Sequence, residues 1–196
     1  MQQIDVSNSA AVLSGGPLGS DYKVLQLHFH WGSDDSQGSE HFYDGQAYPM
    51  EVHIVHYKAA YEGDLDKILN SVDGLAVTGF MFSVGVSINE LCHCIMSMSS
   101  FQVENVALKP ITDALKSINE PDSYKELTTF RLDQLMAPAI GEGQTFATYP
   151  GGLTTPPCNE VVTWLNFKQP LTVSPAQLQA FRFVMDKLLD MHVIMD

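Results

Sequence analysis

The sequence predicts a mainly β (α+β) protein, in which strands dominate and a few helices lie at the periphery. Two observations support this prediction. Turn-forming residues divide the chain at short intervals, and the segments between them are rich in β-branched and aromatic residues. Segments with the periodicity and capping residues of a helix are few. No internal repeat or linker divides the chain, so we expect one domain over residues 1–196.

Four segments are expected to form strands. Residues 22–31 and 48–57 combine aromatic and β-branched residues in an alternating pattern. Residues 75–88 form a long apolar segment that glycines interrupt, and residues 160–167 are a further strand candidate. The connections between these segments are often long, which argues against a plain meander of hairpins.

Residues 174–190 are the strongest helix prediction. Ser174 can cap this helix, Pro175 suits its first position, and Gln177 completes a capping box. Apolar residues then repeat on one face, namely Leu178, Phe181, Met185, Leu188 and Leu189. Residues 111–118 are a shorter helix candidate.

The charge of the chain excludes two classes of partner. Ten Lys and Arg residues against 23 Asp and Glu residues give a net charge of −13. Such a charge repels the phosphate backbone of nucleic acids and an anionic membrane surface. The apolar runs are also shorter than the ~20 residues that a membrane-spanning helix needs, so we expect no transmembrane segment.

Histidines occur at alternate positions of two predicted strands. His28 and His30 share one face of the first strand with Gln26, and the residues between them point the other way, into a core. In the second strand, Glu51 and His53 share one face. If the two strands are neighbours in one sheet, the three histidines converge on one point.

Three imidazoles with an open fourth position are typical of a catalytic zinc site. Metal-bound histidines usually donate their second ring N–H to a carbonyl or carboxylate oxygen, and Gln26 and Glu51 are placed to accept it. The alternative is that a His-x-His pair in a strand is structural, but the third histidine favours the metal site. Six further residues of metal-binding type are interpreted as structural, namely His41, His56, His93, His192, Cys92 and Cys94.

Seven blocks of the sequence resemble the α-class carbonic anhydrases. They follow the order and the ligand spacing of that family over most of the chain, and agreement of several blocks is far more specific than one motif. The blocks are residues 15–18 (GGPL), 26–33 (QLHFHWGS), 38–41 (GSEH), 51–56 (EVHIVH), 73–77 (DGLAV), 149–157 (YPGGLTTPP) and 162–164 (VTW). The resemblance implies a single domain built on a large, mostly antiparallel, twisted central sheet.

The resemblance also implies an enzyme, a zinc lyase (carbonate dehydratase) with Zn2+ bound by His28, His30 and His53. Its reaction is the reversible hydration of carbon dioxide to bicarbonate and a proton, by attack of zinc-bound hydroxide. In carbonic anhydrases zinc lowers the pKa of bound water to about 7. By resemblance, Thr154 accepts a hydrogen bond from the hydroxide and donates its own proton to Glu40, because a threonine hydroxyl both donates and accepts.

The substrate is small and apolar, so the resemblance implies an apolar wall beside the metal. The matching substrate-binding positions are Val55, Val77, Leu153, Thr154, Thr155, Val162 and Trp164. Gln26 and Glu51 match the hydrogen-bond partners of His28 and His53 in the family. The expected small-molecule partners are carbon dioxide, bicarbonate, and sulfonamide and anion inhibitors.

Three departures from the family pattern affect the expected activity. The chain is expected to be incomplete at both termini, because the usual proton-shuttle histidine would precede Met1 and a closing segment would follow residues 192–196. Residues 88–102 resemble an insertion. We therefore expect the chain as given to be less stable and less active than a version with both flanks. The alternative is a carbonic-anhydrase-like domain with weak or no activity, serving as a binding or biomineral-matrix module.

Cys158 directly follows Pro156 and Pro157. Secreted members of the family carry one half of a disulfide at this place, with a partner outside this chain. The resemblance therefore implies a secreted or extracellular-facing protein, an oxidising environment. The alternative is a small buried thiol in a cytoplasmic protein.

Overall fold

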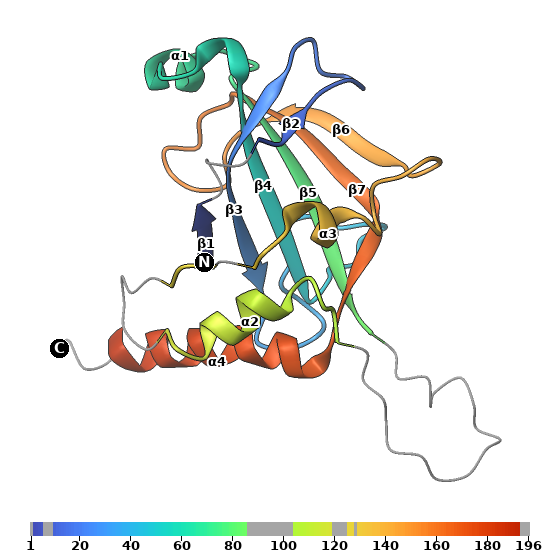
Figure 1. The fold of residues 1–196 in the computed structure, drawn as a ribbon, viewed down its shortest axis with the longest axis vertical. Coiled ribbons are helices and arrows are strands. Elements are labelled where there is room, and N and C mark those ends of the chain that lie inside the picture. The colour runs from blue at the N-terminus through green and yellow to red at the C-terminus, as the bar shows by residue number, and fades with distance from the viewer. Residues whose placement is uncertain (1, 6–9, 86–103, 119–124, 128, 193–196) are drawn as a thin grey trace, which may run out of the picture. The chain divides into compact units, whose positions relative to one another are not determined.

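The computed structural model describes residues 2–5, 10–85, 104–118, 125–127 and 129–192. Within these residues the chain forms seven strands, four α-helices and one 3-10 helix (Figure 1). The strands are β1 (Gln2–Asp5), β2 (Val12–Leu13), β3 (Tyr22–Trp31), β4 (Met50–Lys58), β5 (Leu75–Val84), β6 (Phe146–Gly151) and β7 (Val162–Val173). The helices are η1 (Ala59–Tyr61), α1 (Leu65–Asn70), α2 (Lys109–Leu115), α3 (Leu132–Met136) and α4 (Pro175–His192).

The strands pair into one sheet, with the order β1-β3-β4-β5-β7-β6 and with β2 also paired to β3. The sheet is mostly antiparallel, and the pairs β1–β3, β2–β3 and β6–β7 all have this direction. In the register of β6 and β7, Tyr149 lies opposite Trp164. The prediction of a mainly β fold with few helices is confirmed.

The four predicted strands are observed with similar bounds, whereas β1, β2 and β6 were not predicted. β3 has the predicted bounds, and β4 begins at Met50 rather than at residue 48. β5 ends at Val84, and the predicted continuation from residue 86 lies outside the described residues. β7 is longer than predicted, because Leu171 and Val173 are buried and continue its apolar face beyond residue 167.

The chain forms two compact units. The first contains residues 1–30, 51–81 and 141–170, and the second contains residues 31–50, 82–140 and 171–196. The expectation of a single domain over residues 1–196 stays a prediction.

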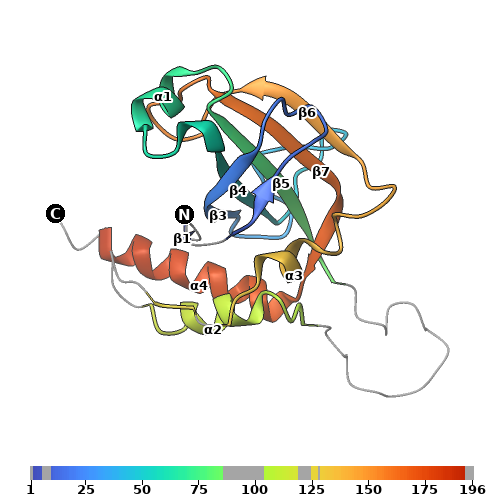
Figure 2. The ribbon, with the colours of Figure 1, turned by 45° about the horizontal axis from the view of Figure 1, so that its top comes forward.

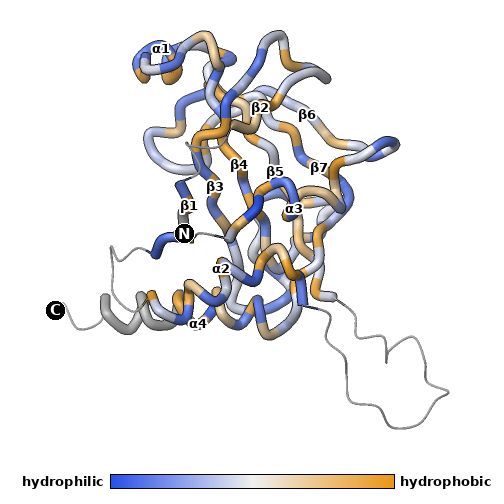
Figure 3. The backbone as a smooth tube through the Cα atoms, viewed as in Figure 1, coloured by the Kyte–Doolittle hydropathy of each residue, from blue (hydrophilic) through white to orange (hydrophobic). Residues whose placement is uncertain are grey.

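In the first unit, apolar side chains lie on both faces of the sheet. One cluster includes Val55, Val77 and Trp164, and the other includes Ala76 and Leu165. Side chains alternate along a strand, so the neighbours Ala76 and Val77 belong to opposite faces. Figure 3 shows apolar residues along β4 and β5, as expected for strands that are covered on both faces.

In the second unit, α4 begins with the predicted capping box. The Ser174 Oγ accepts the N–H of Gln177, and the Gln177 Oε1 accepts the N–H of Ser174, both at 3.2 Å. Gln177 also binds the backbone of Asn105, which precedes α2, at 2.9 and 2.7 Å. Helix α2 lies along α4, as Figures 1 and 2 show from two directions.

Two short helices were not predicted. α1 and α3 have six and five residues, which is too short for a clear helical period. α2 begins at Lys109, two residues before the predicted start at 111. It ends at Leu115, three residues before the predicted end at 118. Among the described residues, no helix combines the length and the apolar character that crossing a membrane requires.

Candidate metal centre

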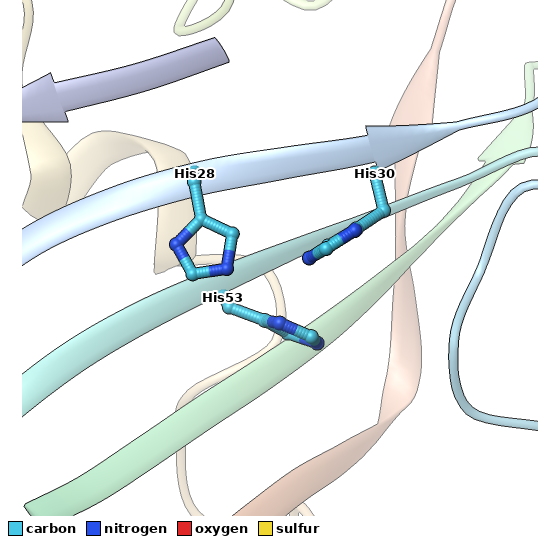
Figure 4. A group of neighbouring side chains, drawn as sticks. All are labelled: His28, His30 and His53. Carbon is cyan, nitrogen blue, oxygen red and sulfur yellow. The ribbon is translucent and has the colours of Figure 1, made fainter. Parts of the chain in front are cut away.

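Three histidines meet on one face of the sheet in the first unit. His28 and His30 come from β3 and His53 comes from β4, which lies next to β3. Figure 4 shows their rings pointing toward one another. The ring centroids lie 5.0 Å (His28–His30), 5.2 Å (His28–His53) and 4.6 Å (His30–His53) apart. One ring nitrogen from each histidine lies within 4.8 Å of the other two, which is a spacing that a metal ion can bridge.

Two of the rings are oriented by hydrogen bonds on the side away from the cluster. The Oε1 of Gln26 lies 3.0 Å from the Nδ1 of His28, and the Oε1 of Glu51 lies 2.7 Å from the Nε2 of His53. Both oxygens are acceptors, so each ring donates from that nitrogen and keeps a lone pair on the other. The Nδ1 of His53 and the Nε2 of His30 are buried and make no hydrogen bond. This donor set fits a metal ion.

Burial keeps the two β3 imidazoles in the form that binds metal. Loss of hydration, reinforced by the nearby His53 ring, lowers the pKa of His28 to about 4. The same two causes lower the pKa of His30 to about 3. Both rings are therefore neutral at pH 7, and neutral imidazole is the form that coordinates zinc.

A pocket of about 520 Å³ opens beside the histidines. Six of the seven predicted substrate-binding residues line it, namely Val55, Val77, Leu153, Thr154, Thr155 and Trp164. The seventh, Val162, is buried in the apolar cluster with Val77 and Trp164. His28, His53 and Gln26 also line it, so the pocket combines apolar walls with a few polar groups.

Sequence reasoning missed a second wall of this pocket. Its side chains belong to residues 57–69, from the end of β4 through η1 to α1, and include Tyr57, Leu65, Ile68 and Leu69. The spacing of Leu65, Ile68 and Leu69 is that of one helix face, and this signal could have identified them. A helix of six residues is too short for that signal to stand out.

A turn holds the threonines at the pocket. The Leu153 N–H donates to the Asn159 carbonyl and the Cys158 N–H donates to the Thr155 carbonyl, both at 3.0 Å. The Trp164 Nε1–H donates to the Gly152 carbonyl at 3.2 Å, which ties the turn to β7. Thr154 and Thr155 are exposed within this turn. Glu40 is an exposed residue of the second unit, so its hydrogen bond with Thr154 stays a prediction.

Two other interpretations from the sequence concern residues away from this cluster. His56 lies on the opposite face of β4 from His53, and its Nδ1 lies 3.2 Å from the Ala76 carbonyl. The expected insertion at 88–102, with Cys92, His93 and Cys94, lies outside the described residues.

A mostly antiparallel sheet that brings three imidazoles together, two of them lining an apolar pocket, defines a β-sheet protein with a candidate metal centre. The chain belongs to the eukaryotic-type carbonic anhydrase family, whose model matches residues 1–193. It is 37% identical over 180 residues to the mitochondrial carbonic anhydrase 5A of Rattus norvegicus, a match that covers 92% of this chain and 52% of that protein. It is 34% identical over 182 residues to carbonic anhydrase 7 of Mus musculus, which covers 92% of this chain and 61% of that protein. The chain thus spans between half and two thirds of the length of these relatives.

The comparisons correct the expected location. The secreted or extracellular-facing assignment is wrong, because the two relatives are a mitochondrial carbonic anhydrase and carbonic anhydrase 7, not secreted forms. Cys158 is exposed in the turn that follows Pro157, and it forms no disulfide within the described residues. The expected secreted location depended on a disulfide at Cys158. A cysteine in such a turn does not by itself require one. The cytoplasmic alternative is compatible with these relatives.

Proposed function

We propose that this protein binds one zinc ion through His28, His30 and His53 and catalyses the reversible hydration of carbon dioxide to bicarbonate and a proton. The observation that carries this proposal is the convergence of three ring nitrogens within 4.8 Å, two of them on histidines that line an apolar pocket. Zinc held by three neutral imidazoles supplies a Lewis acid and a water-derived nucleophile at neutral pH, as is established for carbonic anhydrases.

The chain's own residues orient the ligands and the substrate. Gln26 and Glu51 hold the ring N–H groups of His28 and His53, which directs the other ring nitrogens toward the metal. Carbon dioxide has no hydrogen to donate, so apolar side chains such as Val55, Val77 and Trp164 suit it better than polar ones. These side chains also exclude water from the reacting carbon.

Thr154 has two roles in this proposal. Its hydroxyl accepts a hydrogen bond from the attacking nucleophile and donates to Glu40, which aims the nucleophile at the substrate. Its backbone N–H stabilises the negative charge that develops on a substrate oxygen. The released proton passes to buffer, so we expect turnover to rise with added imidazole. Primary sulfonamides and small anions should inhibit by competing for the metal.

The ligand assignment is tested by zinc stoichiometry. Wild-type protein should hold one zinc per chain by elemental analysis, and His30→Ala should lose most of it. His56→Asn is the matched control, because His56 lies on the opposite face of β4 and should leave the stoichiometry unchanged. Unchanged zinc in His30→Ala would contradict the ligand assignment.

The reaction is tested by stopped-flow hydration of carbon dioxide. Thr154→Ala should lower the rate roughly 100-fold, the scale of a lost proton-positioning group, while Thr154→Ser keeps the hydroxyl and should retain most of it. Zinc binding by the wild-type protein without any hydration would favour the alternative of a binding or biomineral-matrix module.

A further inference from the structure

Asn166 is a buried polar residue on the face of the sheet that carries the histidines. Side chains alternate along a strand, so Asn166 points to the same face of β7 as Trp164, whose ring lies 4.8 Å from that of His53. Only 3% of Asn166 is exposed. A buried carboxamide gives up its hydration, and hydrogen bonds within the protein must offset that cost.

Gly79 of β5 provides the space in which Asn166 and Glu51 meet. β5 lies between β4, which carries Glu51, and β7, which carries Asn166. A Cβ built on Gly79 would overlap the Oδ1 of Asn166 and lie 3.1 Å from the Oε1 of Glu51. The two side chains therefore occupy the volume above this glycine, each from a neighbouring strand.

The chemistry of the two groups decides how they face one another. Glu51 is fully buried, and its Oε1 lies 2.7 Å from the His53 Nε2. A carboxylate accepts several hydrogen bonds, and a buried one is stabilised by each additional donor. An amide N–H of Asn166 that faces this carboxylate makes a charge-assisted hydrogen bond with it, whereas the amide oxygen would be repelled. The carboxylate therefore decides which end of the amide faces it.

We propose that Asn166 is a positioning residue whose amide N–H donates to the Glu51 carboxylate above Gly79. This hydrogen bond holds Glu51 in the orientation that binds His53. The predicted effect on zinc rests on the proposed function, but the hydrogen bond itself belongs equally to the metal-free protein.

The hydrogen bond is tested directly by NMR of the metal-free wild-type protein. One side-chain amide proton of Asn166 should be shifted downfield and protected from exchange with water, and Glu51→Gln should remove most of that shift. Two rapidly exchanging Asn166 protons, or signals that Glu51→Gln leaves in place, would overturn the proposal. The wild-type part of this measurement needs no zinc, activity or substituted protein, so two rapidly exchanging Asn166 protons would overturn the proposal even if Glu51→Gln fails to fold.

The positioning role is tested by zinc affinity in competition with a chelator. Asn166→Leu keeps the size of the side chain and removes its donors, so zinc should bind about 10-fold more weakly, at the low end of the effect of outer hydrogen-bond partners. Thr78→Val is the matched control, because Thr78 is buried on the opposite face of β5 and should leave the affinity within about twofold. An unchanged affinity in Asn166→Leu would overturn the positioning role.

Gly79→Ala provides an independent test. The added methyl group takes the place of the Asn166 amide, so this variant should lower zinc affinity by a similar factor. In the double variant with Asn166→Leu the two effects should not add, because both remove one hydrogen bond. Full additivity would overturn the proposal. A wild-type protein that shows the protected Asn166 amide but binds no zinc would overturn the proposed function alone.

Discussion

The two walls of the pocket are held in different ways. On the sheet side, His28 of β3 and His53 of β4 are buried, and each ring makes a hydrogen bond to a second side chain, Gln26 or Glu51. On the other side, residues 57–69 around η1 and α1 contribute more exposed side chains, and Leu65 is 64% exposed. Ion pairs such as Lys23–Glu62, at 2.6 Å, hold this wall at the surface.

This difference means that the metal ligands and the substrate side of the pocket can be altered independently of each other. The ligand directions depend on strand geometry and buried hydrogen bonds, which leave little freedom. The wall formed by residues 57–69 is held by the buried Ile68, by a helix cap and by surface ion pairs, and its exposed positions tolerate change. Substitutions in the two walls should therefore affect different measurements.

The largest expected effect is on stability, from Ile68→Ala. Ile68 is the buried residue of α1 and packs in the cluster with Val55 and Trp164. Removing its side chain leaves a cavity, so the free energy of unfolding should fall by about 2–5 kcal/mol in chemical denaturation. Leu65→Ala, in the same helix but exposed, should change it by less than about 0.5 kcal/mol. Equal losses would mean that α1 does not pack on the sheet through Ile68.

The next effect is a pH dependence in the metal-free protein. Burial lowers the pKa of His56 to about 4 from its ordinary value of 6.5. The unfolded chain therefore binds the proton first as the pH falls, and stability that is fully present above pH 6.5 is lost between pH 6.5 and about 4. This loss should be about 3 kcal/mol for His56. His56→Asn should reduce the pH dependence of the free energy of unfolding. An unaltered pH dependence would show that His56 is not its source.

A smaller free-energy change is expected in zinc binding, from Glu51→Gln. The charge that stabilises the His53 N–H is lost while the shape is kept, so affinity should fall roughly 10- to 100-fold. Glu62→Gln, in the other wall, is the control and should leave zinc affinity unaltered. If both variants bind zinc as tightly as wild type, the contrast between the walls does not extend to metal binding.

The smallest effect is expected at the cap of α1. The Asp64 side chain accepts the Lys67 N–H at 2.9 Å, so Asp64→Ala should cost about 1 kcal/mol in thermal or chemical unfolding. Asp64→Asn keeps a capping oxygen and should cost much less. Zinc affinity should stay constant in both variants, and a loss of zinc in Asp64→Ala would show that the two walls are coupled.

Structural features that depend on residues a few positions apart in the chain could be predicted well. The alternation of His28, His30 and Gln26 placed three polar groups on one face of β3, and the capping box of Ser174 and Gln177 placed the start of α4. The resemblance to carbonic anhydrases then named residues far apart in the chain, such as Thr154 and Trp164, that line one pocket. The roles of these residues, including the Thr154–Glu40 pair, stay predictions.

The location shows where a resemblance was extended too far. Cys158 matched one position of secreted family members, but a disulfide needs two cysteines, and its assumed partner lay outside the chain. The overall similarity to a mitochondrial relative depends on 180 aligned residues and outweighs that single position.

The sequence by itself determined which residues share a strand face, where α4 begins and to which family the chain belongs. These features depend on periodicity, on caps that span three or four residues and on motifs read in order. Only the tertiary structure decided that β5 lies between β4 and β7, so that Asn166 and Glu51 meet above Gly79, and that Ile68 joins the apolar cluster that contains Trp164. Such contacts arise because burial of apolar faces selects strand neighbours that are far apart in the chain, and no local pattern records that choice.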